Sequence, residues 1–252
     1  MTTATLGKQL AELGFHFAAD NLDDLVARAT KNRWGATELL GYLAVEEAKQ
    51  RVARGVERRL ANSKLGRMTP MANFDWAWPT RIDKAAVEAA LSLDFIEHAR
   101  NVVLIAPQGL GKTMIAQNIA HQAILNGHTA LFTTASKMLL DLGAQESARA
   151  LDLRLKQYER PTVLVVDEVG YLSYDSRNAD LLFQVVSRRY ESKSLILTTN
   201  LHFGEWATVF PNAACATALI DRIVHHADII TIEGKSYRRR AAEESKKAKS
   251  KK

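Results

Sequence analysis

Apolar residues in the first part of the chain recur at the spacing of an α-helix. Between residues 45 and 60 they follow one another at intervals of three and four: Val45, Ala48, Val52, Val56 and Leu60. Such spacing lays one apolar stripe along a helix. Arg51, Arg54 and Arg58 share a different side of the same helix. We therefore expect residues 5–60 to be helical, with one side of this helix available for burial and another available to phosphate groups.

Beyond residue 100 the pattern changes to short apolar runs that alternate with helical stretches. The apolar runs predict five strands, at residues 101–106, 129–134, 162–168, 194–200 and 227–234. The stretches between them predict helices, at residues 113–127, 135–161, 176–193 and 213–227. Continuous apolar strands that alternate with helices are typical of a parallel sheet covered on both faces. The sequence therefore predicts an α/β fold with a five-stranded parallel sheet, preceded by a small all-helical domain.

A segment rich in turn-forming and aromatic residues separates the two patterns. Gly66 and Pro70 interrupt regular structure there. The segment also carries Phe74, Trp76 and Trp78, so we expect it to pack against another part of the protein. The expected organisation is a helical N-terminal domain at residues 1–65, a linker at 66–80, an α/β domain at 81–240 and a basic, disordered tail at 241–252.

Composition narrows the class of protein. The chain has 252 residues, of which 47% are apolar and 25% charged, as in ordinary soluble proteins. No run approaches the roughly 20 apolar residues that cross a bilayer, and the first residues, MTTATLGKQLAELG, lack the apolar stretch of a secretory signal. The single cysteine, Cys215, excludes a disulfide framework and a multi-cysteine metal site. We expect a cytoplasmic protein without membrane contact.

The excess of positive charge lies outside the central region of the chain. Residues 235–252 carry 9 basic and 2 acidic side chains, whereas residues 81–234 carry 14 basic and 17 acidic ones. A further basic stretch spans residues 49–67; its basic residues are Lys49, Arg51, Arg54, Arg58, Arg59, Lys64 and Arg67. The charge pattern fits contacts to nucleic-acid phosphates, and it equally fits a solubilising tail with one charged helix face.

One strand-to-helix junction carries a near match to a phosphate-binding loop. The pattern requires Gly, four arbitrary residues and Gly-Lys-Ser/Thr, and the chain reads LIAPQGLGKT, with Ala106 in place of the first glycine. The two later glycines allow backbone N–H groups to turn toward phosphate oxygens. Lys112 can reach the β- and γ-phosphates of a nucleotide, and Thr113 can offer its hydroxyl to Mg²⁺. The predicted nucleotide-binding residues are Pro107, Gln108, Gly109, Leu110, Gly111, Lys112, Thr113 and Met114.

Two adjacent acids end the strand predicted at residues 162–168. Asp167 lies at the carboxyl end of the strand, where open α/β sheets bind ligands, and it can hold Mg²⁺ through water. Glu168 follows it, and a second carboxylate suits a base that activates or orients water for hydrolysis. The alternative is a strand that merely ends in two solvated acids, which the phosphate loop about 55 residues upstream disfavours.

Further polar residues follow predicted elements in the second half of the chain. Asn200 ends the apolar run LILTTN and would lie beside Glu168 if its strand sits between the phosphate loop and Asp167. Its amide could then hold the attacking water, although such a group at a strand end more often forms a turn. Arg222 and Arg238 fit charge stabilisation, one within the chain and one supplied to a neighbour. By spacing alone, surface ion pairs explain both arginines better.

His225 and His226 raise the question of a metal site. Adjacent histidines on a helix point to different faces, and no third ligand has the spacing of a zinc site. We therefore interpret both as structural or polar residues.

Longer stretches of the chain closely resemble one protein family. The runs are SLDFIEHARNVVLIAPQGLGKT, VDEVGYL, LLFQVVSRRYE, LILTTNLHFGEW and LIDRIVHHADIITIEGKSYR, with FDWAWP in the linker. They resemble the IstB family, helper ATPases encoded beside the transposase IstA in bacterial insertion sequences. The resemblance covers most of the chain. The family is in turn similar to the helicase loader DnaC and the initiator DnaA, within the AAA+ ATPases.

The resemblance implies a role for each candidate residue. By similarity, Lys112 and Thr113 are Walker A residues, Asp167 and Glu168 are Walker B residues, Asn200 is sensor 1, Arg222 is the arginine finger and Arg238 is the sensor 2 arginine. The loop of the family begins with glycine, so Ala106 is a departure that bears on nucleotide affinity rather than on the existence of the site. The implied fold is a helical N-terminal domain followed by an AAA+ core at residues 81–240.

The resemblance also implies cofactors and partners. Its members use ATP and Mg²⁺, assemble on duplex DNA, mark or deform the target and stimulate the transposase. We therefore expect hydrolysis of ATP to ADP and phosphate, self-association that depends on nucleotide and DNA, and an IstA-like partner. The basic stretch at residues 49–67 fits DNA contact by the N-terminal domain, although no motif fixes which of its residues touch DNA.

Three other functions stay open at this point. A DnaC-like replicative helicase loader would use the same ATPase site for a different client and would prefer single-stranded DNA. A DNA-coating architectural protein would hold a nucleotide without turnover, but Glu168 argues against it because binding alone does not need that carboxylate. A small-molecule kinase is disfavoured, since no acceptor-binding pattern is present. The HHADIITIEGKSYR run and the FDWAWP linker favour the transposition helper.

Overall fold

The computed structural model describes residues 2–171, 173–237 and 240. The tail expected at residues 241–252 and the candidate Arg238 lie outside these described residues. The chain divides into two compact units, Met1–Arg58 and Arg59–Lys252, each with its own fold.

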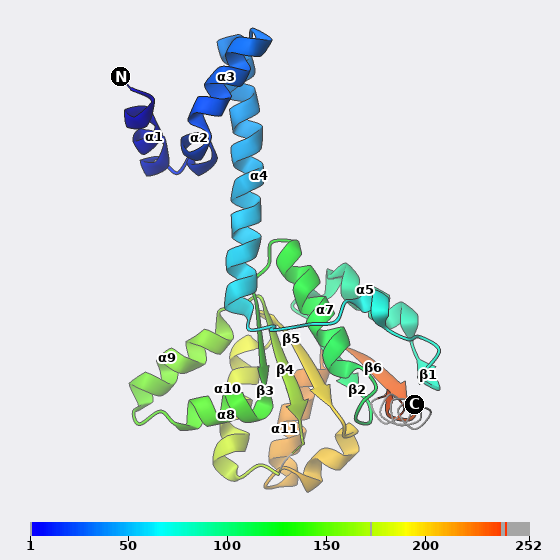
Figure 1. Cartoon of the computed structure of the whole chain (residues 1–252). Helices are drawn as coiled ribbons and strands as arrows, with labels where there is room; N and C mark the ends of the chain where they lie inside the picture. The colour runs from blue at the N-terminus through cyan, green and yellow to red at the C-terminus, as the bar shows by residue number, and fades with distance from the viewer. Residues whose placement is uncertain (1, 172, 238–239, 241–252) are drawn as a thin grey trace, which may run out of the picture. The chain divides into compact units, whose positions relative to one another are not determined.

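The first unit is helical, as the sequence pattern predicts. Its helices, labelled in Figure 1, are α1 (Thr3–Glu12), α2 (His16–Asp20), α3 (Leu22–Asn32) and α4 (Ala36–Ser63). The Thr2 hydroxyl caps α1 by accepting a hydrogen bond from the Thr5 N–H. Arg33 ends α3 in the left-handed conformation that commonly closes a helix.

A buried glutamate links α4 to α2. Glu47 is 3% exposed and accepts hydrogen bonds from the N–H groups of Phe17 at 2.8 Å and Ala18 at 3.3 Å, at the start of α2. Its other oxygen accepts a hydrogen bond from Arg54 at 2.8 Å. Burial opposes ionisation of Glu47, but the hydrogen bonds from Arg54 and from the two N–H groups outweigh it and lower the pKa of this carboxyl. The carboxylate thereby caps a helix that has no side-chain cap of its own.

The apolar stripe expected along α4 is not buried within the first unit. Val45 is 53% exposed and Val52 is 64% exposed. Glu47 lies two positions after Val45, and Arg54 lies two positions after Val52. Two positions correspond to about 200° around a helix, so each polar residue is nearly opposite the valine before it. The expectation that the apolar side is buried is therefore wrong for these positions, because α4 meets α2 through a carboxylate and an arginine on its opposite side.

The second unit is built on a six-stranded sheet. Its strands are β1 (Arg81–Ile82), β2 (Asn101–Ile105), β3 (Ala130–Thr134), β4 (Val163–Val169), β5 (Ser194–Thr199) and β6 (Ala227–Glu233), in the order β1-β6-β2-β5-β4-β3. The five longer strands are parallel, as predicted. The sequence pattern did not predict β1, which pairs antiparallel with the end of β6, because two residues are too few for an alternating pattern to be recognised.

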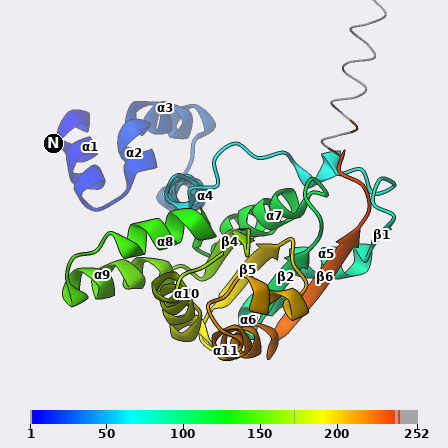
Figure 2. The ribbon, with the colours of Figure 1, turned by 90° about the horizontal axis from the view of Figure 1, so that it is seen from below.

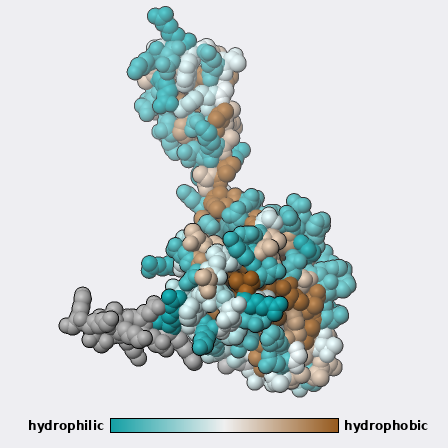
Figure 3. Space-filling view, turned by 90° about the vertical axis from the view of Figure 1, so that its right-hand side faces the viewer, coloured by the Kyte–Doolittle hydropathy of each residue, from teal (hydrophilic) through white to brown (hydrophobic). Residues whose placement is uncertain are grey.

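The strand β1 covers only the last part of the edge strand β6. Ile229, in the part that β1 does not reach, is 44% exposed. Figure 3 looks onto the side of the unit where α5, β1 and β6 lie, and apolar surface (brown) is visible there among polar surface (teal). A short strand of this kind limits an open sheet edge without closing it.

Helices cover both faces of the sheet, as predicted. The helices α5 (Lys84–Ser92) and α7 (Lys112–Leu125) lie on one face, and α8 (Ala135–Gly143), α10 (Ser176–Arg189) and α11 (Ala213–Val224) lie on the other (Figure 2). The helix expected at residues 135–161 is two helices, α8 and α9 (Ala148–Glu159), because the Ser147 hydroxyl caps a new start. The shorter elements are α6 (Asp94–Glu97), η1 (Met71–Asn73) and η2 (Phe203–Thr208). No helix in the described part of the chain is long and apolar enough to span a membrane.

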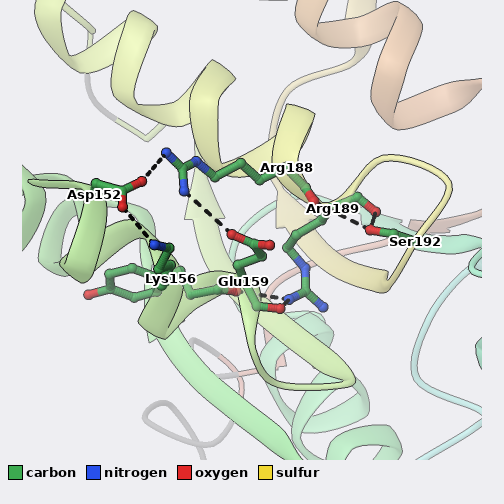
Figure 4. Close-up of polar contacts among 7 residues, drawn as sticks. Asp152, Lys156, Glu159, Arg188, Arg189 and Ser192 are labelled. Atoms are coloured by element: carbon green, nitrogen blue, oxygen red, sulfur yellow. Dashed lines mark hydrogen bonds and ion pairs between the residues drawn. The ribbon is translucent and has the colours of Figure 1, made fainter.

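A buried arginine joins the end of α9 to β5. Arg189 closes α10 and is 1% exposed. Its guanidinium donates to five backbone carbonyls, those of Tyr158, Glu159, Pro161, Thr162 and Ser194. Burial lowers its pKa to about 9, which leaves the group charged at neutral pH. Beside it, Arg188 pairs with Asp152 at 2.8 Å and with Glu159 at 3.4 Å (Figure 4).

Candidate functional site

The glycine loop, residues 106–111, connects β2 to α7. Gly109 has a φ of 79° and Gly111 a φ of 90°, a region that residues with a Cβ rarely adopt. A Cβ at Gly109 would collide with the hydroxyl of Ser236, and a Cβ at Gly111 would lie 2.6 Å from the Phe74 ring. Both glycines are therefore required by backbone conformation and by the space around them.

Ala106, the departure from the loop pattern, occupies an ordinary backbone position. Its φ is not positive, and its side chain is buried at 1% exposure. Its N–H donates to the Thr199 carbonyl at 3.1 Å, which extends the ladder between β2 and β5 by one step. A methyl group is accommodated here because the position continues a strand instead of turning the loop.

The two polar residues that begin α7 point back toward the loop and across to β4. The Nζ of Lys112 donates to the carbonyls of Ala106 at 2.6 Å and Pro107 at 3.0 Å. The Thr113 hydroxyl lies 3.0 Å from Oδ2 and 3.2 Å from Oδ1 of Asp167. Asp167 is 4% exposed, so its carboxylate is oriented by protein partners.

A bulge at the end of β4 brings Asp167 and Glu168 to the same cavity. Val166 pairs with Leu197 and Val169 pairs with Thr199, so the two acids face the single residue between those partners on β5, which is Thr198. Successive residues of a regular strand point to opposite faces. Glu168 departs from this because its φ is 62°, in the left-handed region. A cavity of about 580 Å³ is lined by both acids.

This cavity also gathers most of the other predicted nucleotide-site residues. Residues 108–114 line it, together with Asn200, whereas Pro107 does not. Asn200 is expected beside Glu168 if its strand, β5, lies between the strand before the glycine loop, β2, and the strand that carries the two acids, β4. The sheet has this order. The largest group of candidate residues therefore converges on one hollow at the carboxyl ends of β2, β4 and β5.

The aromatic linker forms a wall of the cavity that the sequence did not locate. The side-chain Oδ1 of Asn118, in α7, accepts a hydrogen bond from the Met71 N–H at 2.9 Å, and the side-chain Nδ2 of the same residue donates to the Thr69 carbonyl at 2.9 Å. These bonds fix the linker on α7, and both Phe74 and Trp78 line the cavity. The predicted packing of the linker against another part of the protein is confirmed, and α7 is that part. The aromatic residues of the linker predict that it packs against the protein, but they do not predict that α7 is the element it packs against.

The residues after β6 close the same wall. The indole N–H of Trp78 donates to the Lys235 carbonyl at 2.7 Å. The N–H of Tyr237 donates to the Gly109 carbonyl at 2.9 Å, and its ring lies edge-on to Trp78 with the centroids 6.0 Å apart. The segment 235–237 thus contacts both the linker and the glycine loop.

Arg222 lies away from the cavity of its own chain. It is in the last turn of α11, with its guanidinium 4.4 Å from the centre of the Phe183 ring in α10. It does not line the cavity. The other candidate arginine, Arg238, is outside the described residues.

The two histidines join a polar cluster at the far ends of α10 and α11. Glu191 lies 3.9 Å from Nδ1 of His225 and 3.4 Å from Nε2 of His226, so the fold supplies a third ligand-type group that the sequence spacing did not reveal. The Tyr190 hydroxyl, however, is 2.7 Å from the same Nδ1 of His225, and the two rings stack. The nitrogen is already engaged, so polar contacts among these side chains explain the cluster.

The seven basic candidates for DNA contact have different surroundings. Lys49 pairs with Glu46 at 2.7 Å, and Arg54 is held by the buried Glu47. The Nε of Arg59 donates to the Ile124 carbonyl at 3.4 Å. The remaining four, Arg51, Arg58, Lys64 and Arg67, are exposed. Arg54 is the candidate whose position is best explained by a structural ion pair.

Comparison with known proteins identifies the family. The model of the "IstB-like ATP binding protein" family matches residues 8–245. The "Insertion sequence IS5376 putative ATP-binding protein" of Geobacillus stearothermophilus is 34% identical over 222 residues, 88% of each chain. A protein with the corresponding name from insertion sequence IS21 of Pseudomonas aeruginosa is 33% identical over 229 residues, 91% of this chain and 86% of that one.

Solved structures support the fold. DnaI aligns with a TM-score of 0.56 over 67% of this chain and 93% of its own, at 18% identity. The replication initiator DnaA, bound to AMPPCP and single-stranded DNA, aligns with a TM-score of 0.50 over 60% of this chain and 45% of its own, also at 18% identity. At such identities the likeness shows the fold alone, which is the expected AAA+ core. With a matching model over nearly the whole length, the chain belongs to the family of IstB-like ATP-binding proteins.

Proposed function

We propose that this chain is an ATPase that assembles on duplex DNA and stimulates the transposase of an insertion sequence. The observation that carries the ATPase part is the cavity in which the glycine loop, the Asp167–Glu168 bulge and Asn200 meet. Family membership and insertion-sequence relatives support the transposition part.

The residues of the cavity suit different roles in ATP hydrolysis: phosphate binding, Mg²⁺ binding and activation of water. The backbone N–H groups of the glycine loop and Lys112 bind the β- and γ-phosphates. The Thr113 hydroxyl and the Asp167 carboxylate suit Mg²⁺, because a hard cation prefers oxygen ligands. When bound, Mg²⁺ offsets charge on the phosphates. Glu168, whose side chain is exposed to solvent, accepts a proton from the attacking water, and Asn200 orients that water.

A second chain completes the site in this proposal. Arg222 does not reach the cavity of its own chain, which favours its donation to a neighbour. An arginine supplied in trans can raise the rate of hydrolysis by about 10³–10⁵. A monomer would then hydrolyse ATP slowly, and assembly on DNA would switch hydrolysis on.

DNA contact in this proposal is electrostatic. Arg51, Arg58, Lys64 and Arg67 are exposed basic side chains, and lysine and arginine contacts to phosphates are independent of base sequence and sensitive to salt. Weak contacts of this kind become tight binding when many copies line one duplex. A helper that must accept many target sites gains from this mode of binding.

The first test is the mass of the protein by light scattering after gel filtration. The samples contain a duplex of a few tens of base pairs, with and without ATP and Mg²⁺, for the wild type and Arg222→Ala. We expect a large complex only when DNA and nucleotide are both present, and a weaker one with Arg222→Ala. A chain that stays monomeric in all samples contradicts the assembly and the role of Arg222.

Two further measurements separate the alternatives. Phosphate release is measured for the wild type and Glu168→Gln; equal rates would favour a DNA-coating protein that does not turn over its nucleotide. Binding to duplex and to single-stranded DNA of equal length is compared by fluorescence anisotropy. A clear preference for single strands would favour a helicase loader over a transposition helper.

A further inference from the structure

One buried threonine faces the two acids of the candidate site. Thr198 is the β5 residue opposite the bulge in β4, and its side chain is 0% exposed. Its hydroxyl donates a short hydrogen bond to Oδ1 of Asp167. The Thr198 hydroxyl oxygen in turn accepts a hydrogen bond from the Glu168 N–H at 3.0 Å. A single hydroxyl therefore holds both residues of the acidic pair.

The second of these bonds follows from the geometry of the bulge. A bulge leaves one extra residue unpaired and locally disrupts the ladder. At the bulge the Glu168 N–H is bonded to the Thr198 hydroxyl, and a buried N–H without an acceptor costs roughly 1–3 kcal/mol. The Thr198 hydroxyl supplies that acceptor from the side chain. It thereby stabilises the conformation that brings the Glu168 carboxylate to the cavity.

The first bond orients the other acid. Asp167 receives hydroxyl groups from two directions, Thr113 of α7 on one side and Thr198 of β5 on the other. Two fixed donors leave the carboxylate little freedom to rotate. Its remaining lone pairs can then be presented to a cation or to a water bound to that cation.

We propose that Thr198 is a positioning residue of the ATPase site, which sets the orientation of Asp167 and the backbone conformation of Glu168 through one hydroxyl group. This inference rests on the proposed ATPase function. Serine can replace threonine in this role because it keeps the hydroxyl. Valine cannot, although it has nearly the same shape, because it offers neither the donor for Asp167 nor the acceptor for Glu168.

The test is steady-state phosphate release in the presence of duplex DNA, measured against ATP and against free Mg²⁺. The variants are Thr198→Val and Thr198→Ser, with Thr133→Val as a matched control. Thr133 is a buried threonine of β3 at 9% exposure, whose hydroxyl bonds only the neighbouring Thr134 carbonyl at 3.3 Å among the contacts of the described residues. Removal of groups that orient metal ligands typically costs about 10–100-fold in activity or metal affinity.

We expect Thr198→Val to lower kcat by about 10–100-fold and to raise the Mg²⁺ concentration for half-maximal rate, with little change in KM for ATP. Thr198→Ser and Thr133→Val should stay close to the wild type. A purely structural role would not produce this split with rescue by serine. Retention of kcat and of the Mg²⁺ dependence in Thr198→Val, or equal loss in Thr198→Ser, overturns the inference.

Two controls keep the outcomes distinguishable. A wild type that releases no phosphate refutes the proposed ATPase function, and the inference falls with it. If the wild type and Thr198→Val are equally active, the role of Thr198 is refuted and the proposed ATPase function stands. Thermal melting reports whether each variant folds, and Thr198→Ala replaces Thr198→Val if valine prevents folding.

Discussion

Two positions of the glycine loop, Ala106 and Gly111, differ in backbone conformation. Gly111 has a positive φ and leaves no room for a Cβ beside the Phe74 ring, whereas Ala106 continues a strand and already carries a methyl group. The two positions look equivalent in the sequence pattern, which asks for glycine at each. They differ physically because only one of them turns the chain.

Gly111→Ala should therefore impair ATP binding, and Ala106→Gly should not. A left-handed alanine costs roughly 1–2 kcal/mol, which alone corresponds to about a tenfold change in affinity, and the contact with the Phe74 ring adds to it. We expect the Kd for ATP, measured by isothermal titration calorimetry, to rise at least about tenfold in Gly111→Ala. Equal affinities in the two variants would contradict this account of the loop.

The sequence predicts residue identities at the site better than their positioning. The loop glycines, Lys112 and the two acids follow from a motif because phosphate and metal chemistry prescribes residue types. The role of Thr198 does not follow, because it depends on a bulge, and a bulge is set by the register between two strands that are far apart in the sequence. The available signal was an apolar run, residues 195–197, that ends in the two threonines Thr198 and Thr199.

Buried charged groups join individual elements, and their contribution to the free energy of unfolding can be measured. Arg189 is the clearest case, since it satisfies carbonyls at the end of α9, in the turn that follows and in β5. Arg188 precedes it on the same helix and makes partly exposed ion pairs. The two neighbours allow a comparison of a buried and a surface arginine within one element.

Arg189→Met should destabilise the second unit more than Arg188→Met does. Loss of the buried guanidinium leaves several carbonyls without a donor, and each unsatisfied group costs roughly 1–3 kcal/mol. We expect a loss of about 3 kcal/mol or more in the free energy of unfolding for Arg189→Met and about 1 kcal/mol or less for Arg188→Met. Urea unfolding followed by circular dichroism measures both, and similar losses in the two variants would show that burial of Arg189 is not the cause.

Glu47 should make the first unit sensitive to acid. The pKa of Glu47 is lowered in the folded state from its ordinary value of 4.5, so its contribution to stability is complete above about pH 4.5 and is lost as pH falls through the lowered value. The amide resonances of Phe17 and Ala18, followed by NMR as pH is lowered, should shift together as the carboxylate is protonated. Glu47→Gln should abolish this pH dependence; its persistence in that variant would assign it to another group.

At the scale of elements, the parallel sheet and most helices could be read from the pattern of apolar residues. The break between α8 and α9 could not, because a capping serine inside a helical stretch overrides the general periodicity. The exposed stripe of α4 was also missed. An amphipathic pattern shows that one side of a helix is apolar, but not which neighbour is available to cover it.

For the whole molecule, the proposed exchange of arginines between chains can be tested by mixing variants. Glu168→Gln lacks the proposed base, and Arg222→Ala lacks the proposed trans arginine. Each should be nearly inactive alone, but a mixed assembly contains sites with an intact Glu168 next to an intact Arg222. We therefore expect phosphate release to rise on mixing the two variants with duplex DNA, and a mixture no more active than its components would place Arg222 outside the shared site.

The contact between Trp78 and Lys235 has a consequence for the synthesis of the protein. These residues are separated by 157 positions. Trp78 lines the cavity beside the glycine loop, and the backbone carbonyl of Lys235 holds its indole there. A ribosome adds roughly 5–20 residues per second, so about 8–30 s pass between the addition of Trp78 and the addition of Lys235, which supplies the acceptor for its indole. Translation that stops before β6 would yield a polypeptide with its phosphate loop and acids but without the last wall. Such a fragment should be recognisable to cellular proteases by its uncovered aromatic linker.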